Sequence, residues 1–137
     1  MHEQALSTDD LLTMIADYME NGFLENIIDM FRHDSGLYSH VGALIQDERV
    51  RVRIGITAMI EELTRLDAGH ISKAVPGLIR VLEHTEPFVR GDAANLLGII
   101  GDSSALPFLR KTADRDKNLN VRLLAEEAIN DIDGKYP

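Results

Sequence analysis

A pattern that occurs three times along the chain constrains its fold more than any other feature. Each copy opens with Val-Arg, and small or apolar residues follow four, seven, eight and eleven positions after the valine. That spacing places the apolar side chains on one stripe of an α-helix. A single helical unit cannot bury such a stripe, so three copies predict a stack of repeated units. The stripes are Val52, Ile56, Met59, Ile60 and Leu63; Val89, Ala93, Leu96, Leu97 and Ile100; and Val121, Ala125, Ala128, Ile129 and Ile132.

A second apolar segment precedes each Val-Arg helix at a nearly constant distance. Pro76 and Pro107 stand thirteen and fourteen residues before their valines, and Ser39 takes the equivalent place in the first copy. Proline suits the first turn of a helix, because its missing N–H has no partner there anyway. Each unit is therefore expected to be a first helix, a polar turn and a second helix.

These units resemble HEAT repeats, in particular the short HEAT-like type of the phycobilisome lyases. The clearest copy is VRGDAANLLGIIGDSSALPFL from Val89, in which Val-Arg, Ala-Ala, Leu-Gly, Gly-Asp and Ala-x-Pro-x-Leu follow the family's order. The resemblance covers about residues 39–133 and implies an all-α fold, an α-solenoid of about four antiparallel helix pairs. It implies little about function, because such repeats serve many unrelated roles.

We expect a single domain over residues 1–137. A divergent N-terminal helical cap occupies 1–35, and repeats follow at 36–70, 71–101 and 102–133. Ser7 and Thr8 are typical of a helix start, and Asn21-Gly22 of a helix stop. The cap is either packed on the array, as a terminal repeat requires, or loosely attached and dependent on a partner.

Acidic residues are concentrated in the N-terminal third of the chain. Residues 1–48 contain ten Asp or Glu and one basic residue, Arg32, so this segment carries the whole net charge of −9. It either keeps the protein soluble or steers a basic partner. Nucleic acid is an unsuitable partner, because polyanion binding needs a positive surface.

Composition also limits where the chain works. Cysteine is absent, and no stretch approaches the roughly 18 apolar residues of a membrane span. The N-terminus lacks the basic region and apolar core of a secretory signal. We expect a cytoplasmic location, no membrane association and an oligomeric state that the sequence leaves open.

The resemblance also raises the possibility of a metal enzyme, since some HEAT-like proteins are di-iron hydroxylases of a modified lysine. Their repeats place His-Glu directly after Val-Arg, where this chain has Ile54-Gly55, Gly91-Asp92 and Leu123-Leu124. Bilin handling, as in the lyases, is disfavoured by the absence of Cys and Trp. We therefore predict no metal, no cofactor and no catalytic residue, and interpret the histidines as surface or capping residues: His2, His33, His40, His70 and His84.

The arginine of each Val-Arg pair is expected to have a structural role. Arg53, Arg90 and Arg122 lie beside the buried stripe, about 100° around the helix from the valine. We predict a ladder of ion pairs and backbone hydrogen bonds with the preceding turns, with Asp47, Glu86 and either Asp114 or Asp116 as partners. A ligand-binding row of arginines is the alternative. In the first copy we expect Val50 and Val52 to face inward.

The side of each second helix opposite its stripe is the predicted binding surface. Offsets two, six and nine after the valine lie there, and they include Gly91 and Gly98 in the second copy. We predict a non-catalytic interaction scaffold that binds a basic or amphipathic protein segment on a concave face and is not an enzyme. The alternatives are a maturation subunit for a cofactor-containing enzyme and a self-associating module. The predicted partner-binding residues are Ile54, Glu61, Glu62, Asn95, Leu123, Glu127, Asn130 and Asp131.

Overall fold

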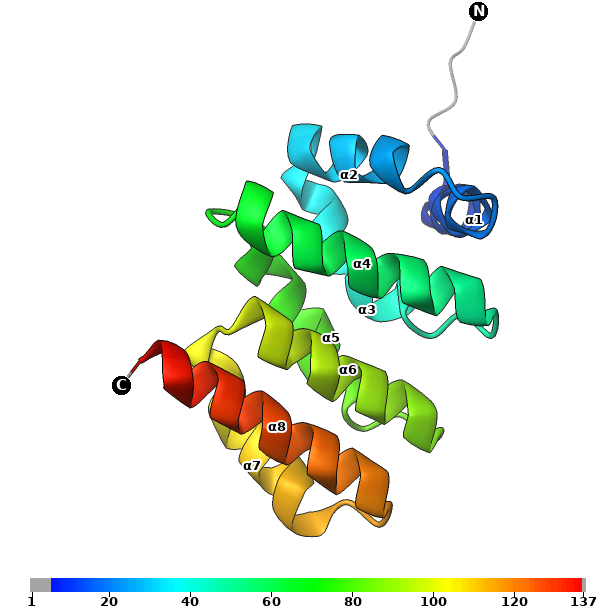
Figure 1. The fold of residues 1–137 in the computed structure, drawn as a ribbon. Helices are drawn as coiled ribbons and strands as arrows, with labels where there is room; N and C mark the ends of the chain where they lie inside the picture. Colours follow the sequence, from blue (N-terminus) through cyan, green and yellow to red (C-terminus); the bar gives the residue numbers. More distant parts are fainter. Residues whose placement is uncertain (1–5, 137) are drawn as a thin grey trace, which may run out of the picture.

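The computed structural model describes residues 6–136, so His2 lies outside the described residues. Within them the fold is all-α, with eight α-helices and no strand, which confirms the predicted solenoid of helix pairs (Figure 1). No helix in this part of the chain is long and apolar enough to cross a membrane. The helices are α1 Thr8–Glu20, α2 Leu24–His33, α3 Val41–Leu44, α4 Val50–Leu66, α5 Val75–Val81, α6 Pro87–Ile100, α7 Leu106–Arg115 and α8 Leu119–Lys135.

The long second helices α4, α6 and α8 lie side by side in one layer, with the shorter first helices α3, α5 and α7 behind them (Figure 1). A short 3-10 helix leads into each first helix: Ser35–His40, Ile71–Ala74 and Ser103–Ala105. The prolines Pro76 and Pro107 stand in the first turn of α5 and α7, as their spacing predicts.

The three apolar stripes form the core. Every member is buried except Ile129, which is partly buried. Our expectation that Val50 faces inward is wrong, because Val50 is 56% exposed while Val52 is fully buried. The cause is the helical period: α4 begins at Val50 itself, and two residues turn a helix by about 200°, which puts the two valines on opposite sides.

Two glycines that the helical wheel placed on the exposed side of α6 are buried instead. A Cβ on Gly98 would lie 2.8 Å from the Cα of Ala128, and one on Gly91 would lie 2.9 Å from Leu124 Cδ1. Glycine at these positions lets α8 pack directly against α6, and the close approach covers part of the surface that we predicted to be free. Gly101 ends α6 in the left-handed conformation, at φ 77°.

The N-terminal helix α1 crosses the array and is seen end-on in Figure 1, above the start of α4. Ser7 Oγ accepts a hydrogen bond from the backbone N–H of Asp10 at 3.1 Å. Ile15 and Met19 are buried, and Met19 packs against Gly55 of α4. Arg49 pairs with Asp17 at 3.0 Å. These contacts join α1 to the start of α4.

Candidate functional site

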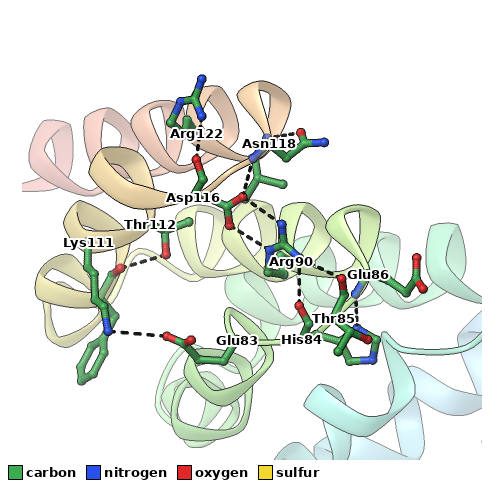
Figure 2. A network of polar contacts seen from close by, with 12 residues as sticks. Glu83, His84, Thr85, Glu86, Arg90, Lys111, Thr112, Asp116, Asn118 and Arg122 are labelled. Atoms are coloured by element: carbon green, nitrogen blue, oxygen red, sulfur yellow. Dashed lines mark hydrogen bonds and ion pairs between the residues drawn. The ribbon is translucent and has the colours of Figure 1, made fainter.

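The three repeat arginines bind backbone carbonyls of the turn before their own helix. Arg90 Nη1 donates to the carbonyl oxygens of His84 and Thr85 at 3.0 and 3.1 Å (Figure 2). Arg53 and Arg122 make the equivalent bonds six residues back, and Arg53 also five residues back. These carbonyls follow the end of a helix and lack helical partners, so a charged donor there stabilises the turn.

The carboxylate partners of Arg53 and Arg90 come from the next repeat rather than from the preceding turn. Arg90 forms a bidentate pair with Asp116, with Nε–Oδ2 at 2.8 Å and Nη2–Oδ1 at 2.9 Å (Figure 2). Arg53 instead uses one nitrogen, Nε, to contact Asp92 Oδ2 of α6 at 3.2 Å. The predicted partners in the preceding turns are therefore wrong as carboxylates: Asp116 pairs with Arg90 of the previous repeat, and it binds Arg122 only through its backbone carbonyl. Asp47 likewise binds Arg53 only through its backbone carbonyl.

A hollow of about 430 Å³ opens between α4 and α6 beside the Arg53–Asp92 pair. Three of the predicted binding residues, Ile54, Glu61 and Asn95, line it. The other wall residues are Val50, Arg53, Thr57, Ala58 and Asp92. Volumes of this order are typical of sites for small molecules or single side chains. We call it the α4–α6 hollow.

The remaining predicted residues lie outside that hollow. Glu62 is partly buried and pairs with Arg65 at 2.7 Å on α4. The four on α8 are exposed and lie beyond α6: Leu123, Glu127, Asn130 and Asp131. A second space of about 450 Å³, the α6–α8 hollow, is lined by Pro87, Phe88, Gly91, Asp92, Asn118, Asn120, Val121 and Leu124.

Asp92 is the functional candidate that the sequence analysis missed, and it lines both hollows. Burial raises the pKa of its carboxyl group above the usual value, although the charge and hydrogen bond of Arg53 act in the opposite direction. The Arg53 guanidinium also lies over the ring of Phe88, 4.7 Å from its centroid. The signal available in the sequence was the position of Asp92, three residues after Val89 where the hydroxylases carry glutamate.

Iron does not fit the described residues. Of the six residues that follow the Val-Arg pairs, Asp92 alone is a metal-ligand type, and its carboxylate already binds Arg53. No group of three or more His, Cys, Asp or Glu side chains that could hold a metal occurs among residues 6–136. A di-iron centre needs several carboxylate and imidazole ligands converging on one point.

Comparison with known proteins finds similarity to one repeat family and to two enzymes. The family model described as HEAT repeats matches residues 39–130. The deoxyhypusine hydroxylase of Schizosaccharomyces pombe is 45% identical over 62 residues, which are 44% of this chain and 18% of that protein. The enzyme of the same name from Saccharomyces cerevisiae is 43% identical over 61 residues, 43% of this chain and 19% of that protein. The chain thus spans less than a fifth of the length of the curated relatives it matches.

These names overturn two of our predictions. Both relatives are enzymes by name, which contradicts the expectation of a non-catalytic scaffold and the expectation that the chain is not an enzyme. The reason for the error is physical. The prediction rested on the absence of His-Glu after Val-Arg and of Cys and Trp, which argues against particular metal and bilin sites but leaves other parts in a reaction, such as substrate binding, open.

Proposed function

This chain belongs to the HEAT repeat family, and from that premise we propose that it takes part in the enzymatic hydroxylation of a lysine-derived side chain. Its part in the reaction is to bind the cationic substrate. Support comes from the name shared by the two relatives, deoxyhypusine hydroxylase. The single observation that carries the proposal is the α4–α6 hollow, which combines apolar walls with the carboxylates of Glu61 and Asp92.

The chemistry of deoxyhypusine matches such a hollow. It is a lysine side chain lengthened by an aminobutyl group, so it carries basic amines on a long methylene stem. Amines of this kind are protonated at neutral pH. Val50, Ile54 and Ala58 would contact the methylene groups, and Glu61 would accept hydrogen bonds from an ammonium group. An ammonium group beside Asp92 would also offset the burial that disfavours its charged form.

The rest of the substrate would lie along the exposed side of the second helices. We propose that a basic segment of the substrate protein crosses Glu61, Glu62, Asn95, Glu127 and Asp131. The acidic residues of positions 1–48 would steer its approach. The oxygen-activating group would be held by residues other than the described ones, since their donor set does not fit iron.

Two narrower predictions from the sequence stay predictions. One is that the repeats are of the short type found in phycobilisome lyases, which carries no bilin chemistry here. The other is a cytoplasmic location. Neither affects the binding of a cationic side chain.

Binding of synthetic peptides to the full chain tests the proposal. Three peptides differ at one position, which holds deoxyhypusine, lysine or norleucine. We expect the deoxyhypusine peptide to bind most tightly and norleucine least, by fluorescence anisotropy, because binding depends on the number of ammonium groups. Equal affinity for all three would refute the proposal. Hydroxylation by the purified chain with ferrous iron, read as one added oxygen in mass spectra, would show that our exclusion of iron is wrong.

A matched pair of variants locates the site. Glu61→Gln removes one exposed carboxylate from the α4–α6 hollow, and Asp114→Asn removes one from α7. We expect only Glu61→Gln to weaken the deoxyhypusine peptide, by about three- to tenfold, the net value of one ordinary hydrogen bond at an exposed site. Equal losses from both variants would indicate a general charge effect and remove the hollow as the site.

A further inference from the structure

The two hollows flank the first half of α6 and share one residue. Asp92 lines both, while Phe88 lies in the α6–α8 hollow with the Arg53 guanidinium stacked on it. The array therefore offers two neighbouring depressions on one face, separated by a single helix. Helices packed in this way have axes about 8–10 Å apart. The two depressions are thus separated by a distance of the same order.

Large apolar side chains are exposed around these hollows. They stand at the starts of three successive second helices: Val50 and Ile54 on α4, Phe88 on α6, and Leu119 and Leu123 on α8. On α4 and α8 they occupy the same two repeat positions, two residues before and two after the core valine. A row of exposed apolar groups that recurs with the repeat is typical of an interaction surface.

The second halves of α4 and α8 are acidic, whereas the second half of α6 carries no acidic residue. Glu61 on α4 and Glu127 and Asp131 on α8 are exposed, and none takes part in the ion pairs found among residues 6–136. The face thus has an apolar row at the starts of all three helices and free carboxylates farther along α4 and α8. We call this two-row surface the second-helix face.

We infer that the second-helix face binds a basic amphipathic helix of a partner protein, laid across α4, α6 and α8. An extended segment would point alternate side chains in opposite directions, whereas a helix presents an apolar row and a basic row to one surface together. Two apolar residues seven apart on a helix are separated by ~10.5 Å, which matches the two hollows. Lysines or arginines on the adjoining side would meet the free carboxylates.

This inference goes beyond the proposed hydroxylation, and it stands whether or not the chain has that activity. The partner helix would use the α4–α6 hollow and the carboxylates of Glu61, Glu127 and Asp131, so it and the basic substrate segment would exclude each other there. Binding of the helix requires apolar residues at two positions, and binding of a single modified lysine requires none. The two proposals therefore fail in different experiments.

The probe is a designed helical peptide with leucines seven residues apart and lysines on the adjoining side, labelled for fluorescence anisotropy with the full chain. Two comparison peptides have the same composition in scrambled order, or glutamine in place of lysine. We expect the designed helix to bind on the order of tenfold more tightly than either, with the advantage over the glutamine peptide shrinking as salt rises. Equal binding of the designed and scrambled peptides would overturn the inference.

Matched variants place the peptide on the protein. Leu123 on α8 and Phe108 on α7 are both 47% exposed, but they lie on different helix layers. We expect Leu123→Ser to weaken the designed peptide on the order of tenfold and Phe108→Ser to leave it unchanged. Glu127→Lys should likewise weaken it more than Asp114→Lys. Equal effects within either pair would show that the second-helix face is not where the helix binds.

Discussion

The Arg90 and Arg53 contacts begin with the same residue at the same repeat position and end in different environments. Arg90 is held bidentately by Asp116, whose side chain is 7% exposed, whereas Arg53 makes one bond to Asp92, which is 36% exposed. The pKa of the Asp116 carboxyl is lowered, with the hydrogen bond from Arg90 as the main cause. The pKa of Asp92 is raised, with burial as the main cause. Both oxygens of the Asp116 carboxylate are bound by Arg90, whereas the Asp92 carboxylate lies beside an open hollow.

The difference follows from one residue in the turn before each second helix. Asp47, His84 and Asp116 all stand five residues before their core valine. Asp47 and Asp116 accept the backbone N–H two residues later, and His84 Nδ1 accepts the equivalent bond from Glu86. Asp116 also binds Arg90 of the previous repeat through both of its carboxylate oxygens, but an imidazole has no carboxylate to offer Arg53. Arg53 therefore pairs with Asp92 on the face of α6.

The largest effect on the free energy of unfolding is expected from a substitution in the buried core. Leu97 of α6 is fully buried, so Leu97→Ala should lower the free energy of unfolding by about 3–5 kcal/mol. Glu61→Ala, on the exposed side of α4, should change it by no more than about 0.5 kcal/mol. Urea denaturation measures both values. Similar losses would mean that our assignment of buried and exposed helix sides is wrong.

The second largest effect should be the difference in unfolding free energy between substitutions at Asp116 and at Asp92. Asp116→Ala leaves the Arg90 guanidinium in a largely buried position without its partner, and we expect a loss of about 3 kcal/mol. Asp92→Ala breaks a more accessible pair and should cost less than about 1 kcal/mol. The same denaturation series compares them. An equal cost would show that the two ion pairs are energetically equivalent despite their geometry.

Asp116 and Asp92 should affect the pH dependence of stability in opposite directions. A lowered folded pKa means that Asp116 stabilises the fold above its unfolded pKa near 3.8 and loses this effect as pH falls through the folded value. A raised folded pKa makes Asp92 do the reverse, so its cost to folding is relieved on acidification. Unfolding free energies measured from neutral to acid pH should fall less steeply in Asp116→Asn and more steeply in Asp92→Asn than in the unaltered chain. Identical slopes would contradict this assignment.

The smallest effect should come from restoring the missing carboxylate. His84→Asp gives the middle turn the residue of the other two repeats and offers Arg53 a second partner. We expect a gain of about 0.5–1 kcal/mol, typical of a partly exposed ion pair. A double-mutant cycle with Arg53→Gln should then show coupling between the two positions. Without coupling, the turn residue does not decide which carboxylate Arg53 binds.

The sequence predicted the repeat architecture well and the candidate site in part. The stripe residues from Val52 to Ile132 follow the helical period, which local chain geometry imposes. The exposed positions Ile54, Glu61 and Asn95 follow from the same period and lie together in the hollow. Gly91 and Gly98 were misplaced because a helical wheel contains no neighbouring helix. Asp92 was noted only as part of a departure from His-Glu, because its partner comes from another repeat 39 residues away.

By itself, then, the sequence determined that the chain forms stacked helix pairs and which side of each helix is buried, because both depend on residues a few positions apart. Tertiary structure alone decided how closely each helix approaches the next. That distance buried Gly98 against Ala128 and placed Asp92 within reach of Arg53 Nε, while Arg53 Nη1 still binds the carbonyls of its own preceding turn. Hollows and cross-repeat ion pairs depend on the separation and register of whole helices, and no spacing within one helix encodes them.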